Sequence, residues 1–126
     1  LLFTLHQKDY HPDHVAASRI TEAAAFSAGL PKYADDGSDW HYDSILYFSA
    51  DQRTNPQRPQ VLVDVSDVME EKLHACDAHV SQKVSGFAKA YAESLGKIAG
   101  VPYAEGLYLG QAVVLDRVQG LLKMNH

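Results

Sequence analysis

The chain opens on Leu1-Leu2-Phe3-Thr4-Leu5, continues through Tyr10-His11-Pro12-Asp13-His14, and then runs from residue 15 to residue 28 in helix formers. The apolar opening predicts a buried strand. Pro12 suits the first turn of a helix, where its missing N–H is not needed. A stripe of small and apolar residues keeps helical spacing and is predicted to lie close on a sheet: Val15, Ala16, Ile20, Ala23, Ala24 and Ser27. The stretch therefore predicts a strand followed by a helix, with two histidines at their junction.

The remaining residues alternate between strand-like and helix-like segments. Strands are predicted at residues 44–48, 60–65 and 103–109, and helices at residues 85–99 and 112–122. Ser66 is predicted to cap a further helix of about four turns. Its apolar stripe consists of Met69, Leu73, Cys76 and Val80. This order is typical of an α/β protein, and the predicted sheet is incomplete because an edge of its first strand has no neighbour.

Composition narrows the classes of function for these 126 residues. Apolar residues make up 46%, which excludes disorder, and sixteen acidic against eleven basic residues give a net charge of −5. The basic residues are scattered singly, so we expect no nucleic acid as a partner. The longest apolar runs fall far below the roughly 18 to 20 residues of a membrane helix, and no export signal is visible, so we expect no membrane partner. The single cysteine, Cys76, fits a reducing compartment, and we expect a cytoplasmic location.

His11 and His14 have the strongest case for chemistry. On a helix, residues three apart lie roughly 60° apart around the axis and about 4.5 Å along it, so both imidazoles reach one small volume. The helix dipole disfavours a protonated imidazole at this end and leaves a neutral nitrogen for a metal. Asp13 is a candidate to accept an imidazole N–H or to cap the helix. The alternative is that His11 caps the helix start and His14 is a surface residue.

The residues alone predict half of a metal site. A hydrolytic metal usually takes three protein ligands and leaves a position for water. The sequence offers His14, with His11 as a further candidate, and has no second H-x-x-H, no H-E-x-x-H and no cysteine pair. It also lacks a G-x-S-x-G elbow and a Gly-rich phosphate loop.

Five segments, in the same order, resemble the PIG-L/LmbE-like zinc-dependent N-acetylglucosamine deacetylases. The first is Tyr10-His11-Pro12-Asp13-His14-Val15-Ala16-Ala17, which resembles the H-P-D-H signature between a strand and an Ala-rich helix. The others are residues 23–33, residues 61–66, Lys72 together with His79-Val80-Ser81-Gln82, and residues 100–106. The resemblance covers roughly residues 1–110 and implies a Rossmann-like layered α/β fold.

Family roles carry over to the matching positions. The resemblance implies that His14 ligates zinc, that His11 acts as a general acid or stabilises the tetrahedral oxyanion, and that Tyr103 lies near the substrate carbonyl. It implies wall or sugar contacts for Ser81, Gln82 and Glu105. Zinc would polarise the acetamide carbonyl and lower the pKa of its water, while the second imidazole would meet developing charge. The implied activity is zinc-dependent hydrolysis of the acetamide of an N-acetylglucosamine-type conjugate.

The family's other signature, A-H-P-D-D-x-E, is absent from the sequence. In the family it supplies a zinc His, a zinc Asp and the general-base Asp. The only Asp-Asp pair here, Asp35-Asp36, lies in a polar loop. We therefore expect residues 1–126 to be the C-terminal portion of a single LmbE-like deacetylase domain. The N-terminal strands and helices, and the remaining His and Asp ligands of zinc, are expected ahead of Leu1.

Two other interpretations stay open. In one, the chain is a degenerate, noncatalytic relative that keeps the cleft as a carbohydrate-binding or structural module. In the other, it is an unrelated α/β domain with a chance H-P-D-H. Zinc stoichiometry separates the enzyme from the noncatalytic relative. For the enzyme, the expected partners are an N-acetylated amino sugar and either a missing N-terminal half or further copies of the chain.

Overall fold

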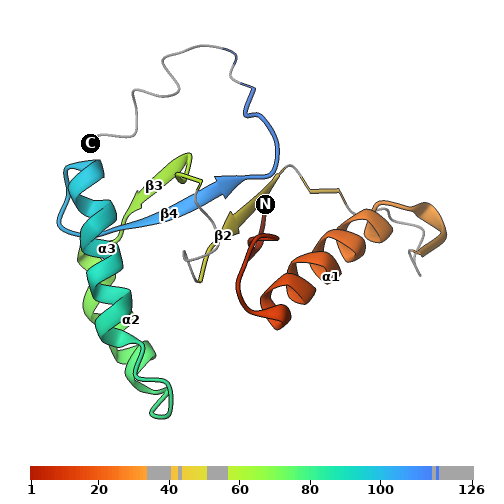
Figure 1. Ribbon diagram of the computed structural model, residues 1–126. Helices are drawn as coiled ribbons and strands as arrows, with labels where there is room; N and C mark the ends of the chain where they lie inside the picture. Colours follow the sequence, from red (N-terminus) through yellow and green to blue (C-terminus); the bar gives the residue numbers. More distant parts are fainter. Residues whose placement is uncertain (34–40, 43, 51–56, 115, 117–126) are drawn as a thin grey trace.

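A four-stranded sheet with three α-helices forms the described part of the protein (Figure 1). The computed structural model describes residues 1–33, 41–42, 44–50, 57–114 and 116. The strands are β1 (Leu2–Leu5), β2 (Ile45–Phe48), β3 (Val61–Asp64) and β4 (Ala104–Leu109). The helices are α1 (Pro12–Ala28), α2 (Met69–Asp77) and α3 (Ser85–Ala99), with short 3-10 turns at Pro31–Tyr33 and Ser66–Val68. Within these ranges, no helix has the length and apolarity needed to cross a membrane.

Three strands run in one direction and the fourth runs against them. The order is β1-β2-β4-β3, where β1 and β2 are parallel and β4 is antiparallel to both β2 and β3. The carboxyl ends of β1, β2 and β3 and the amino end of β4 therefore lie along one side of the sheet, which we call its carboxyl end. Ligand sites of α/β proteins form beyond the carboxyl ends of strands, so the junction of β1 and α1 lies where such a site is expected.

Helices α1 and α3 pack on the same face of the sheet. Tyr47 of β2 and Tyr108 of β4 are cross-strand partners, so their side chains point to one face. The Tyr47 hydroxyl donates to Glu22 Oε1 of α1 at 2.8 Å. Gly106, two residues before Tyr108, faces α3, because a Cβ added there would lie 3.3 Å from Leu95 Cδ1. Helix α2 packs in turn on α3, beside which it runs in Figure 1.

The opposite face of the sheet is apolar apart from Glu105, the cross-strand partner of Val63, and neither α1 nor α3 covers it. Phe3, Phe48 and Val63 lie on this face with 56%, 40% and 41% of their surface exposed. Half-buried aliphatic residues lie between them: Leu5, Leu46, Val61, Leu107 and Leu109. We call these eight residues the open face. Sheets made only of parallel strands carry helices on both faces, whereas this sheet is mixed, with one parallel and two antiparallel pairs.

The predicted strands and the helix at residues 85–99 are confirmed, with bounds within one residue. Helix α3 ends where the sequence predicts, because Gly100 takes a φ of 78°, a left-handed conformation that glycine adopts without steric cost. Helix α1 begins at Pro12, as predicted from the residue that lacks an N–H. Helix bounds marked by glycine and proline were thus predictable from the sequence.

The prediction of a four-turn helix capped by Ser66 is wrong. The Ser66 hydroxyl donates to Asp64 Oδ1 at 2.6 Å and does not cap the helix, so a 3-10 turn comes first and the N-cap of α2 is Val68. The helix has nine residues and ends at Asp77, which leaves Val80 80% exposed outside it. A local side-chain bond between Ser66 and Asp64 thus replaced the expected cap.

Two further helix predictions also differ from the structure. In α1 the buried residues are Ser18 and Ala25, whereas Ile20 is 69% exposed, so the face toward the sheet is the one with the smallest side chains. Thr4 Oγ1 of β1 donates to Thr21 Oγ1 of α1 at 3.1 Å, which adds a polar contact on that face. Of the helix predicted at residues 112–122, the described residues 112–114 and 116 are not helical, and the others lie outside the described residues.

Glu22 and Tyr47 form a pair whose strength should depend on pH. Hydrogen bonds from Gln7, and secondarily from Tyr47, hold the pKa of Glu22 below its ordinary value of 4.5. We expect Tyr47→Phe to lower the free energy of unfolding by about 1 kcal/mol at pH 7. A depressed carboxyl pKa stabilises the fold above 4.5, and this stabilisation is lost as pH falls through the folded-state pKa. Urea unfolding at neutral pH and at a series of pH values below 4.5 should show the gap between the two proteins narrowing as the carboxyl protonates, and a constant gap would contradict the pairing.

Gly96 of α3 packs directly against the turn that leads to β4. A Cβ at this position would lie 2.6 Å from the carbonyl oxygens of Val101 and Pro102. We expect Gly96→Ala to lower the free energy of unfolding by about 1–3 kcal/mol, because helix and turn must separate. Gly86→Ala in the same helix is the matched control, since no atom lies within 4 Å of the added Cβ, and it should be neutral or stabilising by up to about 1 kcal/mol. Thermal unfolding measures both, and equal Tm values would contradict the packing.

Candidate functional site

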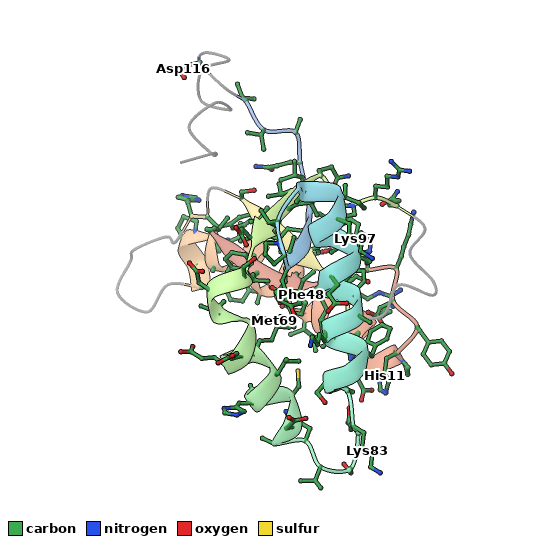
Figure 2. All side chains as sticks on the ribbon, turned by 90° about the vertical axis from the view of Figure 1, so that its left-hand side faces the viewer. His11, Phe48, Met69, Lys83, Lys97 and Asp116 are labelled. Carbon is green, nitrogen blue, oxygen red and sulfur yellow. The ribbon has the colours of Figure 1, made fainter. Side chains whose placement is uncertain are left out.

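His11 and His14 lie side by side where β1 leads into α1, at the carboxyl end of the sheet. Their ring centroids are 4.9 Å apart, and the ring planes are tilted by 31°. The His11 side chain is 50% exposed and that of His14 is 31% exposed. Figure 2 shows His11 toward the lower end of the molecule, beyond the sheet. The two imidazoles therefore share one small, solvent-accessible volume, as their spacing predicts.

Asp9 connects this pair to the loop after β1. Its Oδ1 lies 2.9 Å from His14 Nδ1 and accepts the His11 backbone N–H, also at 2.9 Å. The Asp9 side chain is fully buried, and its Oδ2 has no hydrogen-bond partner among the described residues. Asp13, the candidate acceptor from the sequence, is 86% exposed, and its Oδ2 lies 3.7 Å from His11 Nδ1. The carboxylate that contacts His14 is therefore Asp9, which is not among the residues predicted from the sequence.

A local sequence signal for Asp9 did exist. Asp residues commonly accept the backbone N–H two residues further on, in an Asx turn, and Asp9 does so with His11. This turn also brings the same oxygen against His14. Helical periodicity does not predict the contact between Asp9 and His14, because Asp9 precedes the helix.

His11 is the N-cap of α1. Its Nδ1 accepts the backbone N–H of Asp13 at 3.2 Å. In the neutral ring the hydrogen then lies on Nε2, which the cap does not use. His11 can therefore cap the helix through Nδ1 and still offer a hydrogen bond from Nε2 of the same ring.

Tyr103 lies at the same end of the sheet as the histidines. It directly precedes β4, where its backbone N–H donates to Ser66 Oγ at 3.1 Å and its carbonyl accepts the Val65 N–H at 3.1 Å. Strand β4 is two places from β1, so Tyr103 is displaced across the sheet from the histidine pair by roughly 10 Å. The strand order therefore brings Tyr103 to the same end of the sheet as the histidine pair without placing it in contact with the pair.

The other residues implied as sugar contacts lie in the turn between α2 and α3 and on β4. Ser81 and Gln82 are exposed in the turn between α2 and α3, and Figure 2 shows Lys83, the next residue, toward the same lower end as His11. Glu105 forms an ion pair with Lys72 of α2. This pair ties α2 to β4, so the Glu105 carboxylate already has a cationic partner.

The described residues fit one ligand of a zinc site and not the full set. They contain no group of three or more His, Cys, Asp and Glu side chains that could hold a metal ion. His14 offers one ring nitrogen as a ligand, and His11 offers one N–H donor beside it. A hydrolytic zinc takes three protein ligands, so the remaining ligands would have to come from outside this described set.

A cavity of about 250 Å³ lies apart from the histidine pair. It is lined by Glu22, Tyr42, Ile45, Tyr47, Gly110 and Gln111. Ile45 begins β2 and Gly110 follows β4, so the cavity lies at the opposite side of the sheet from its carboxyl end. It therefore does not belong to the candidate site.

Comparison by sequence relates the chain to a deacetylase. No protein-family model matches the chain. A diacetylchitobiose deacetylase from Thermococcus kodakarensis is 33% identical over 108 residues, which cover 77% of this chain and 39% of the deacetylase. The chain is thus homologous to this enzyme at modest identity and spans about two fifths of its length.

Comparison by structure places the fold among α/β proteins of the same kind. The conserved protein TT1542 from Thermus thermophilus matches with a TM-score of 0.79 and 29% identity, over 92% of this chain and 54% of TT1542. GalB, the 4-carboxy-2-hydroxymuconate hydratase from Pseudomonas putida, matches over the same shares with a TM-score of 0.75 and 19% identity. The N,N'-diacetylchitobiose deacetylase from Pyrococcus horikoshii, in complex with its inhibitor, matches with a TM-score of 0.66 and 24% identity, over 85% of this chain and 44% of that enzyme.

These matches support the predicted α/β class, and the structure shows that the sheet is mixed. The likenesses to GalB and to the Pyrococcus enzyme show the fold alone. Because a hydratase and a deacetylase share it, the fold does not decide the reaction, which has to be argued from the site.

Proposed function

We propose that this chain is part of a zinc-dependent N-deacetylase of the PIG-L/LmbE type, with the Rossmann-like fold of that family. Its substrate would be the acetamide of an N-acetylglucosamine-type sugar. The observation that carries the proposal is the His11–His14 pair, with ring centroids 4.9 Å apart at the carboxyl end of the sheet. The sequence relation to a diacetylchitobiose deacetylase supports both the reaction class and an acetylated sugar as substrate.

The two histidines would have different tasks. His14 would ligate zinc, which when bound polarises the acetamide carbonyl and lowers the pKa of a water molecule. His11 would donate from Nε2 to charge that develops on oxygen or nitrogen, because its Nδ1 accepts the helix N–H. Tyr103, at the same end of the sheet, would contact the substrate carbonyl, and Ser81 and Gln82 would contact the sugar.

The remaining zinc ligands would come from further polypeptide. The chain spans 54% of TT1542 and 44% of the Pyrococcus deacetylase, so each of these proteins has about as much chain again. The open face, with Phe3 56% exposed, offers apolar surface that additional helices would bury. We propose that a segment with the A-H-P-D-D-x-E signature covers this face and supplies the missing His and Asp ligands.

Zinc stoichiometry tests this division of the site. We expect the 126-residue chain alone to bind zinc weakly or not at all, because one imidazole is too few ligands. We expect stoichiometric zinc once a segment with A-H-P-D-D-x-E is restored, in the same chain or as a partner. Equilibrium dialysis followed by metal analysis measures both. Tight equimolar zinc in the 126 residues alone would contradict the ligand assignment, and a completed protein without zinc would favour the noncatalytic relative.

Substitution of the histidines tests their separate tasks in the completed protein. His14→Ala should abolish zinc binding, whereas His11→Ala should keep zinc and lower the rate of acetate release by about 10²- to 10⁴-fold. His11→Asn retains a capping acceptor, so it separates the loss of the cap from the loss of the Nε2 donor. His74→Ala is the matched control, since His74 is exposed in the last turn of α2. Zinc content and acetate released from an N-acetylglucosamine conjugate are the readouts, and normal release in both site variants would refute the proposal.

A further inference from the structure

We infer that Asp9 is a positioning residue that fixes the ring orientation and the tautomer of His14. The inference rests on the proposed function in one respect only, which is that Nε2 of His14 would be a zinc ligand. The contact itself is a property of the chain and can be measured without zinc.

The contact selects one tautomer of His14. An ionised carboxylate only accepts hydrogen bonds, so the 2.9 Å contact between Asp9 Oδ1 and His14 Nδ1 requires a hydrogen on Nδ1. In the neutral ring the lone pair is then on Nε2, the atom on the far side of the ring from Asp9. An imidazole held in this way by a carboxylate presents a metal-binding nitrogen with a set direction.

The carboxylate is itself held in place. Asp9 Oδ1 also accepts the backbone N–H of His11 at 2.9 Å, which ties the side chain to the turn before α1. The Asp9 side chain has no exposed surface, so water cannot replace His14 as its hydrogen-bond partner unless the loop moves. One buried oxygen thus links the start of the helix to the orientation of the ring.

The environment of Asp9 Oδ2 indicates that Asp9 has a role besides stabilising the fold. Asp9 Oδ2 is buried and has no hydrogen-bond partner among the described residues. Buried polar atoms in folded proteins nearly always have partners, and a half-satisfied carboxylate destabilises the fold around it. Its contact with His14 gives a functional reason for a carboxylate at this position. Asp13 offers no comparable reason, because it is 86% exposed.

Ring ¹⁵N NMR of the zinc-free 126-residue chain tests the contact directly, at a pH where the imidazoles are neutral. We expect wild-type His14 to carry its hydrogen on Nδ1, and Asp9→Ala to shift it to a mixture that includes the Nε2–H form. Asp9→Asn keeps an acceptor oxygen without the charge, and should give an intermediate population. It also serves as the second variant if Asp9→Ala does not fold. A wild-type ring with its hydrogen on Nε2, or a larger tautomer shift in Asp13→Ala than in Asp9→Ala, would overturn the inference.

Zinc affinity of the completed protein provides the second readout. We expect Asp9→Ala to weaken zinc binding by about 10- to 100-fold in a chelator competition, whereas Asp77→Ala, which removes an exposed carboxylate of α2, should not change it. The two proposals fail separately. If Asp9→Ala shifts the tautomer while His14→Ala keeps zinc, the proposed function fails and the positioning role holds. If His14→Ala loses zinc while Asp9→Ala changes neither tautomer nor affinity, the positioning role fails and the proposed function holds.

Discussion

The geometry of the candidate site depends on one buried oxygen, Asp9 Oδ1. It accepts the His11 N–H and contacts His14 Nδ1, both at 2.9 Å, so it ties the loop after β1 to the first turn of α1. The same turn makes His11 the N-cap, with Nδ1 on the Asp13 N–H. The two rings therefore present different groups at Nε2. His14 presents a lone pair on this atom, and His11 presents an N–H. In the proposed enzyme, a metal ligand and a hydrogen-bond donor would therefore act side by side without exchanging roles.

The packing of α1 on the sheet places this local arrangement at the carboxyl end of the sheet. Ser18 and Ala25 are the buried residues of α1, and small side chains let the helix axis approach β1 closely. The bond between Thr4 and Thr21, together with that between Tyr47 and Glu22, attaches the helix to both parallel strands. The direction of α1, and with it the location of its histidine-bearing first turn, is thus fixed at several points along its length.

The sequence predicted features set by one residue or by regular spacing, and it missed those set by local side-chain bonds. Pro12 and Gly100 mark helix bounds through backbone geometry, and the spacing of His11 and His14 places two rings together; both are visible in the sequence. The side-chain bond from Ser66 to Asp64 displaced an expected cap, and the contact from Asp9 to His14 joins a loop to a helix. Such contacts depend on the path of the loop, which hydrophobic periodicity does not describe. The helix face was missed because Ser18, a polar residue, is buried where Ile20 was expected.

In the proposed enzyme, further polypeptide would both cover the open face and supply the remaining zinc ligands. Within the described residues β1 is an edge strand, because it pairs with β2 alone, and its other side has unpaired backbone groups. A strand added there in the direction of β1 would end about 4.8 Å from it at the carboxyl end of the sheet, next to the loop that holds His11 and His14. Side chains just after such a strand would reach the same volume as the two rings. A parallel connection into this position brings a helix, which would lie on a face of the sheet. A right-handed connection that leads from such a strand away from β1 would lay its helix on the face opposite α1, which carries Phe3 and Phe48. In the proposed enzyme, one additional strand and helix would therefore bury the apolar surface and complete the metal ligands together.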